Sequence, residues 1–172
     1  MRLDVTFPSG QDTCAAWLYL PKTNSPAPVI VMAHGLGGVK TMRLDAFAEQ
    51  YCEAGYACLV FDYRHFGDSS GEPRQLLSIS KQLEDWSNAV KFAQQDARLD
   101  SQRVIVWGTS FSGGHVLRTA ASVTGIAGVM SQCPFTNGIA SSLALHPLSS
   151  LKVSALALMD LVSLPFRREP VM

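Results

Sequence analysis

The strongest constraint on the fold is an alternation of short strand-like runs with helical segments. Strand-like apolar runs occupy residues 29–33, 57–61, 104–107 and 126–130, each too short for a helix but long enough for a buried strand. Between them, residues 44–52 and 79–93 carry apolar side chains at three- and four-residue spacing, and residues 111–121 are predicted as a third helix. This order predicts an α/β fold with a right-handed, doubly wound and mostly parallel sheet.

Both ends of the chain depart from this alternation. Residues 3–7 alternate apolar with polar side chains, residues 9–12 are turn formers, and residues 14–20 are apolar again. An N-terminal antiparallel hairpin is therefore expected. Residues 136–150 are rich in Ser and are expected to form a loop, whereas residues 151–164 are expected to form an apolar helix. A further strand is due on the earlier pattern, but the sequence contains none before it ends.

Composition excludes several classes of protein. Hydrophobic residues make up 47% of the chain and charged residues 16%, which is enough for a core and rules out wholesale disorder. Fourteen basic residues balance 14 acidic ones, so neither nucleic acid nor a membrane is expected as a partner. No uncharged apolar run reaches the roughly 18 residues of a membrane-spanning helix. The N-terminus lacks the apolar segment of a secretory signal.

The cysteines indicate a compartment. None of the four forms a CxxC pair, so they are interpreted as buried small apolar residues in a reducing environment, and a cytoplasmic protein is expected. They are Cys14, Cys52, Cys58 and Cys133.

Three predicted strands end in unusual sequences, and ligands of open α/β sheets bind beyond the carboxyl ends of strands. These exits are residues 34–38 (HGLGG), 62–71 (DYRHFGDSSG) and 108–115 (GTSFSGGH). In the third exit, Ser110 lies on a predicted strand-to-helix turn, and Gly108, Gly113 and Gly114 leave room for a crowded backbone. The N–H groups of the new helix can stabilise an oxyanion there, by about 3 kcal/mol per good donor. The alternative is a Ser/Gly-rich helix cap without chemistry.

Together, these exits resemble those of the α/β-hydrolase superfamily over roughly residues 1 to 135. The third is similar to the nucleophile turn G-x-S-x-G, with Ser112 in place of the last glycine. The first looks like the HGxG loop, and the second is similar to D-x-R-G-x-G-x-S, with His65 in place of a glycine. The resemblance is to esterase, dienelactone-hydrolase-like, serine-aminopeptidase-like and S15-peptidase-like members, some of whose fungal relatives are acyl (polyketide) transferases.

The resemblance implies a serine hydrolase acting on an ester, thioester or amide, with no cofactor and no metal. Ser110 is the implied nucleophile that forms an acyl-enzyme, and the backbone N–H groups of Leu36 and Phe111 are the implied oxyanion hole. His34 is expected to order its turn rather than transfer a proton. Asp62 and Arg64 are expected to pair as a loop brace.

A base and an orienting acid are also needed, since a serine hydroxyl is a poor nucleophile alone. Two histidines follow Ser110 in the sequence: His115, on the helix that follows, and His146, before a proline. The carboxylates in this part are Asp160 and Glu169, and no histidine follows either. The resemblance implies that acid and base belong to strands after the last residue. The expected organisation is residues 1–136 as the N-terminal part of a hydrolase core and residues 137–172 as the start of a lid.

Other functions stay open or are disfavoured. A phosphate-binding loop would need a lysine where Gly114 stands, and a dinucleotide fingerprint would need a glycine where Lys40 stands. The four histidines lack the paired spacing of metal ligands. A catalytically incomplete binding or dimerising module, and an acyltransferase in a longer protein, remain alternatives. The expected partners are a small-molecule acyl substrate and, as a possibility, a second copy in a homodimer.

Overall fold

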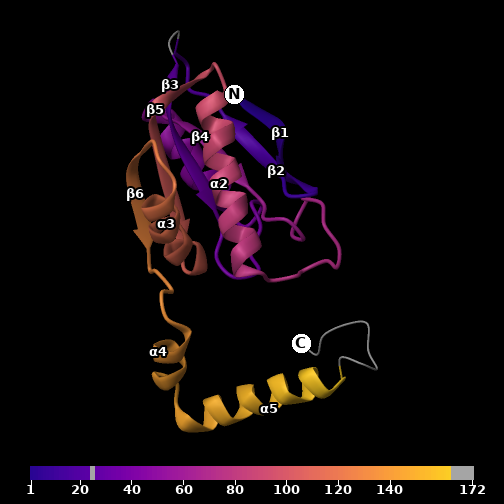
Figure 1. The fold of residues 1–172 in the computed structure, drawn as a ribbon. Coiled ribbons are helices and arrows are strands. Elements are labelled where there is room, and N and C mark those ends of the chain that lie inside the picture. The colour runs from indigo at the N-terminus through magenta and orange to yellow at the C-terminus, as the bar shows by residue number, and fades with distance from the viewer. Residues whose placement is uncertain (24–25, 164–172) are drawn as a thin grey trace. The chain divides into compact units, whose positions relative to one another are not determined.

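The strand-like runs form a six-stranded sheet in the order β1-β2-β4-β3-β5-β6 (Figure 1). The structure is a computed structural model that describes residues 1–23 and 26–163. Antiparallel pairing joins β1 to β2 and β2 to β4, whereas β3, β4, β5 and β6 pair in parallel. The predicted N-terminal hairpin and mostly parallel sheet are confirmed. The strands are β1 (Arg2–Ser9), β2 (Asp12–Tyr19), β3 (Ala27–Ala33), β4 (Ala57–Phe61), β5 (Leu99–Thr109) and β6 (Ile126–Gln132).

The helices confirm most of the sequence-based expectations and correct one. They are α1 (Leu44–Glu53), α2 (Ile79–Gln95), α3 (Phe111–Ser122), α4 (Gly138–Leu143) and α5 (Pro147–Ser163). The loop predicted at residues 136–150 is wrong, because α4 and the first turn of α5 lie within it. Asn137 caps α4 by accepting a hydrogen bond from the Ala140 amide at 3.0 Å. The last residue of the predicted helix 151–164 lies outside the described residues.

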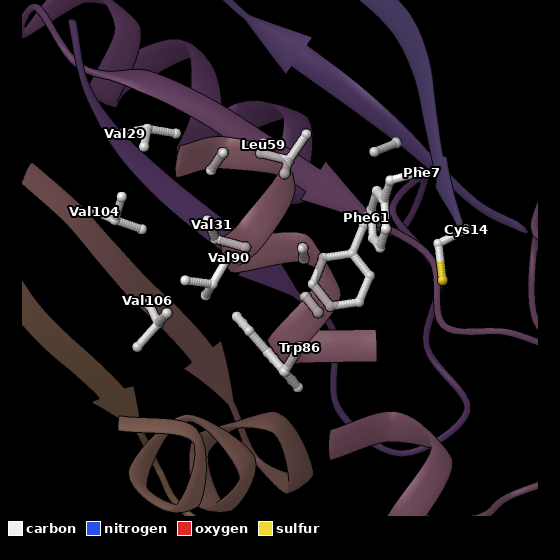
Figure 2. Close-up of a cluster of buried hydrophobic side chains, with 14 of the residues drawn as sticks. Phe7, Cys14, Val29, Val31, Leu59, Phe61, Trp86, Val90, Val104 and Val106 are labelled. Atoms are coloured by element: carbon white, nitrogen blue, oxygen red, sulfur yellow. The ribbon is translucent and has the colours of Figure 1, made fainter. Parts of the chain in front are cut away.

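Two apolar clusters cover the two faces of the sheet. On one face, Trp86 and Val90 of α2 face Val31, Phe61 and Val106 of the central strands, as Figure 2 shows. On the other face, residues of α1 pack against β3 and β4, with Trp107 in the same cluster. The side chains of β4 are all buried, which is what a strand covered on both faces requires. The core thus holds the three parallel strand exits in place.

The chain divides into two compact units, Met1–Thr136 and Asn137–Met172. In the first unit, β6 lies at an edge of the sheet and its side chains are half-buried or exposed. In the second unit, the described side chains of α5 are exposed, apart from the half-buried Ser150. No helix within residues 1–23 and 26–163 combines the length and the apolar character needed to cross a membrane.

The cysteines only partly follow the prediction. All four thiols are free. Cys14 and Cys58 are buried, and burial raises the pKa of both thiols. Cys52 is half-buried and Cys133 is exposed, so the expectation that all four are buried is wrong. Cys133 lies just after β6, an edge strand of the sheet, rather than within the core.

A buried ion pair joins the second strand exit to α2. Arg64 Nε donates to Asp85 Oδ1 at 2.5 Å, and the Arg64 amide donates to Asp85 Oδ2 at 3.1 Å. Ser9 Oγ donates to the same carboxylate at 2.6 Å. Asp85 is fully buried and Arg64 is 4% exposed, while Glu84, which also accepts from Arg64, is half-exposed. The carboxylate that anchors Arg64 in the interior is therefore Asp85.

Asp85→Ala is expected to lower the free energy of unfolding by about 3–5 kcal/mol, because it leaves the Arg64 guanidinium buried beside an empty site. Glu84→Ala is the matched control, since it removes an exposed carboxylate from the same guanidinium, and its cost should stay below about 1 kcal/mol. Urea unfolding followed by circular dichroism measures both. Equal losses in the two variants would contradict the importance of burial.

Candidate active site

Ser110 lies at the sharp turn between β5 and α3, and its side chain is exposed. Its backbone has φ 56° and ψ −113°, a conformation that residues with a Cβ rarely adopt. The turn is crowded: a Cβ on Gly108 would lie 2.3 Å from the Ser112 carbonyl oxygen, and one on Gly113 would lie 2.9 Å from the Gln132 carbonyl oxygen. The two glycines are therefore a condition of the turn.

Two hydrogen bonds hold the strained residue from both sides. The Ser110 amide donates to the Gln132 carbonyl at 2.9 Å, and the Phe135 amide donates to the Ser110 carbonyl at 2.8 Å. Both partners belong to the end of β6 or the segment after it. Because the backbone of Ser110 is fixed in this way, its side chain points away from the core and stays accessible.

The first strand exit lies directly against the serine. A Cβ on Gly35 would lie 3.0 Å from Ser110 Cβ and 3.4 Å from Ser110 Oγ, so only a residue without a side chain fits there easily. The Gly38 amide donates to the Gly35 carbonyl at 3.2 Å and closes a turn around Leu36, whose side chain is 64% exposed. The structure thus brings the residue before Leu36 into contact with Ser110. The roles of the Leu36 and Phe111 amides in an oxyanion hole stay predictions.

His34 is hydrogen-bonded within its own loop. Its Nε2 lies 2.7 Å from the Met42 carbonyl, and its Nδ1 accepts from the Gly35 amide at 3.1 Å. A carbonyl can only accept, so Nε2 is the donor to Met42 in this arrangement. These contacts are those of a residue that orders a turn.

The second strand exit is braced differently from the expectation. Asp62 does not pair with Arg64: its Oδ2 lies 2.7 Å from Lys40 Nζ, and its Oδ1 accepts from the Lys40 amide at 2.6 Å. Lys40 is 2% exposed and also reaches Asp68 at 2.5 Å. Burial alone would lower the pKa of Lys40, but the hydrogen bonds to Asp62 and Asp68 outweigh it and raise the pKa. Lys40 therefore stays charged and ties the first exit to the second.

The predicted brace was wrong because two neighbouring residues of one loop point to different partners. Arg64 turns toward Asp85 of α2, whereas Asp62 turns toward Lys40. Lys40 is also a residue that the sequence analysis missed as part of the site. The signal was a lysine two residues after the glycine-rich first strand exit, where an exposed position would have been the ordinary expectation.

His115 faces the interior rather than the serine. It is 6% exposed, its Nε2 lies 2.8 Å from Gln82 Oε1, and its ring packs edge-on against Phe111 with the centroids 4.7 Å apart. Burial lowers the pKa of His115 to about 4. Within residues 1–23 and 26–163, no histidine is hydrogen-bonded to the Ser110 side chain, and the side chain of Asp160 is outside the description.

The described part of the chain contains no cluster of metal ligands. Among the described residues, no group of three or more His, Cys, Asp or Glu side chains is arranged to hold an ion. The first unit presents an exposed, strained serine with a glycine-rich loop beside it.

The sheet order and the strained serine between β5 and α3 define an α/β-hydrolase. The model of one family in this class, X-Pro dipeptidyl-peptidase (S15 family), matches residues 10–149. The chain belongs to this family, as the resemblance of its strand exits had indicated.

Several known proteins are similar. Quorum-quenching protein AidA of Acinetobacter baumannii is 55% identical over 170 residues, covering 99% of this chain and 56% of that protein. Thiohydrolase aneE of Aspergillus aculeatus is 38% identical over 117 residues, covering 68% and 36%. The crystal structure of α/β hydrolase GrgF from Penicillium sp. sh18 superposes with a TM-score of 0.80 at 26% identity, covering 99% and 57%. The polyketide transferase grgF of Penicillium sp is 27% identical over 160 residues, covering 93% and 46%. The chain thus spans about half the length of the curated relatives it matches, or less.

Ser110→Gly is expected to be more stable than Ser110→Ala by about 1 kcal/mol or more, because glycine adopts φ 56°, ψ −113° without the clash of a Cβ. At Ser87, inside α2, the order should reverse, and glycine should be less stable than alanine by about 1 kcal/mol. Chemical denaturation of the four variants tests both. The same order at the two positions would mean that the turn is not strained.

The burial of His115 predicts a pH dependence. Its pKa in the folded chain is about 4, below the ordinary value of 6.5, so the unfolded chain takes up a proton first as the pH falls. Stability is therefore lost between roughly pH 6.5 and pH 4, by about 3 kcal/mol. His115→Gln, which keeps a polar group near Gln82, should lose correspondingly less stability over this range. Unfolding curves from pH 7 to pH 4 measure the difference, and parallel profiles would contradict the prediction.

Proposed function

We propose that this chain carries the nucleophile and the oxyanion hole of a serine hydrolase. Ser110 Oγ attacks the carbonyl carbon of an ester, thioester or amide while a base takes its proton. The N–H groups of Leu36 and Phe111 donate to the oxyanion that forms. The oxyanion then collapses, the leaving group departs with a proton, and Ser110 holds the acyl group until water releases it.

The observation that carries this proposal is the combination of strain and exposure at Ser110. A non-glycine residue with φ 56° costs stability, by about 1–3 kcal/mol, and persists only where its surroundings enforce it. Here the enforced conformation exposes a hydroxyl at the start of α3, with Gly35 against it. Such strain is typical of a nucleophile turn, whereas a helix cap without chemistry does not require it.

The proposed substrate is a small acyl compound with an ester or thioester bond. A thiohydrolase and a polyketide transferase among the relatives support acyl chemistry at this site, and transfer differs from hydrolysis only in the acceptor. The quorum-quenching relative, at 55% identity, extends the proposal to a signal molecule with a hydrolysable acyl bond. A lactone is a cyclic ester and falls within this class.

The proposal also includes a base, an acid and an acyl acceptor in the whole protein. We also propose a cytoplasmic location and a homodimer.

A second candidate function is a binding or dimerising module without catalysis. It is favoured by one observation, that no described histidine is bonded to Ser110. Ester turnover by the 172-residue chain alone, abolished in Ser110→Ala, would remove this alternative.

In the protein that carries this chain, a fluorophosphonate probe should label Ser110, because the probe reacts with an activated serine and leaves a tetrahedral adduct in the oxyanion hole. Ser110→Ala should lose the label and, on the order of a millionfold, the turnover of acyl esters and thioesters. Ser87→Ala, a serine inside α2, should be labelled like the wild type.

Peptide mapping of the labelled protein identifies the modified residue. Folded protein without a label on Ser110, or with the label unchanged in Ser110→Ala, would contradict the proposal. Adding an alcohol or thiol acceptor during turnover distinguishes transfer from hydrolysis, since a transferase forms a new ester or thioester in place of the free acid.

A further inference from the structure

Ser112 occupies the position at which the nucleophile-turn pattern has a glycine. It lies in the first turn of α3 and is fully buried. Its hydroxyl makes two contacts: it is hydrogen-bonded to the Tyr63 hydroxyl, and it donates to the carbonyl oxygen of His34. Ser112 therefore joins the nucleophile turn to the first and second strand exits at once.

The direction of these hydrogen bonds follows from their ends. At one end the Trp86 indole, which can only donate, lies 2.7 Å from the Tyr63 hydroxyl oxygen. At the other end the His34 carbonyl can only accept. Tyr63 must then donate to Ser112, and Ser112 to His34, for every group to be satisfied. The result is one donor chain from Trp86 through Tyr63 and Ser112 to His34.

Burial keeps this chain intact. Trp86 and Ser112 have no exposed surface, and Tyr63 is 2% exposed. Burial raises the pKa of Tyr63, so its hydroxyl stays protonated and continues to donate. Because Trp86, Tyr63 and Ser112 are buried, removing one of the two hydroxyls is costly for the neighbours that it pairs with.

The chain ends on the loop that lies against the nucleophile. The His34 carbonyl belongs to the peptide that joins His34 to Gly35, and Gly35 is the residue in contact with Ser110. Fixing that carbonyl fixes the plane of the peptide, and with it the start of the turn that carries the Leu36 amide. Two further hydrogen bonds hold this turn. The Gly38 amide donates to the Gly35 carbonyl, and the His34 ring is hydrogen-bonded to the Met42 carbonyl.

We propose that Ser112 is a positioning residue that sets the oxyanion loop against Ser110. Its hydroxyl holds the His34–Gly35 peptide in the orientation from which the Leu36 N–H can reach an oxyanion. The serine at this position therefore supplies a contact that the glycine of the pattern cannot make. This inference rests on the proposed function for its kinetic consequences, but its structural consequence can be measured without turnover.

The kinetic test compares Ser112→Ala and Ser112→Gly with the wild type in the protein that carries this chain. Both variants should lower kcat by about 10–100-fold and leave KM within about threefold, because a displaced oxyanion donor weakens the transition state more than substrate binding. Affinity for a boronic acid, which mimics the tetrahedral intermediate, should fall in parallel with kcat/KM. Tyr63→Phe should reduce kcat in the same direction, and its effect should not add fully to that of Ser112→Ala.

The matched control is Ser131→Ala. Ser131 Oγ donates to the Gly113 carbonyl at 2.8 Å, so this variant also removes a serine hydroxyl bonded to the start of α3, but one that does not touch the oxyanion loop. Its kcat and boronic acid affinity should stay within about twofold of the wild type. A variant of Ser112 with unchanged kcat, or a control with the same loss, would overturn the inference.

The structural test is amide hydrogen exchange over residues 34–38. Exchange there should be faster by about tenfold or more in Ser112→Ala and unchanged in Ser131→Ala, because only the first releases the His34 carbonyl. Unchanged exchange in Ser112→Ala would overturn the inference. Faster exchange in a protein whose Ser110 takes no fluorophosphonate label would support the positioning contact while contradicting the proposed function, so the two failures are distinguishable.

Discussion

The chain reverses at Ser110 in a backbone conformation that a residue with a Cβ avoids unless its neighbours enforce it. Hydrogen bonds to Gln132 and Phe135 supply that enforcement from the segment that ends β6. Gly108 and Gly113 make it sterically possible, because a side chain on either would collide with the backbone. The exposed hydroxyl is thus a consequence of how β5, α3 and β6 are joined, and the other parts of the site are arranged around it.

Buried polar contacts arrange the neighbouring loops. Lys40 and Asp62 join the first strand exit to the second, while Arg64 joins the second exit to α2. Ser112 adds a link from the nucleophile turn to the first exit. The side chains of Lys40, Asp62, Arg64 and Ser112 are buried, so these contacts are costly to separate and hold the loops at defined distances. Rigid loops of this kind are what a preorganised oxyanion site requires.

Hydrophobic periodicity predicted the fold because it reports which side chains are buried. The stripe that contains Trp86 and Val90 became the face of α2 against the sheet. The wrong predictions concern features that the periodicity of apolar residues does not report. The loop expected after residue 136 contains α4, for which the capping side chain of Asn137 was the available signal. The exposure of Cys133 depends on its position after an edge strand, which residue type does not reveal.

The sequence by itself determined the alternation of strands and helices and the serine between two glycine-rich positions, because local spacing and residue type suffice for both. Only the tertiary structure decided that Gly35 lies against Ser110, that Asp62 pairs with Lys40 instead of Arg64, and that His115 turns inward to Gln82. The physical reason is that these contacts join residues far apart in the chain. Their geometry depends on strand order and register, which bring the three exits together at the carboxyl ends of the parallel strands β3, β4 and β5.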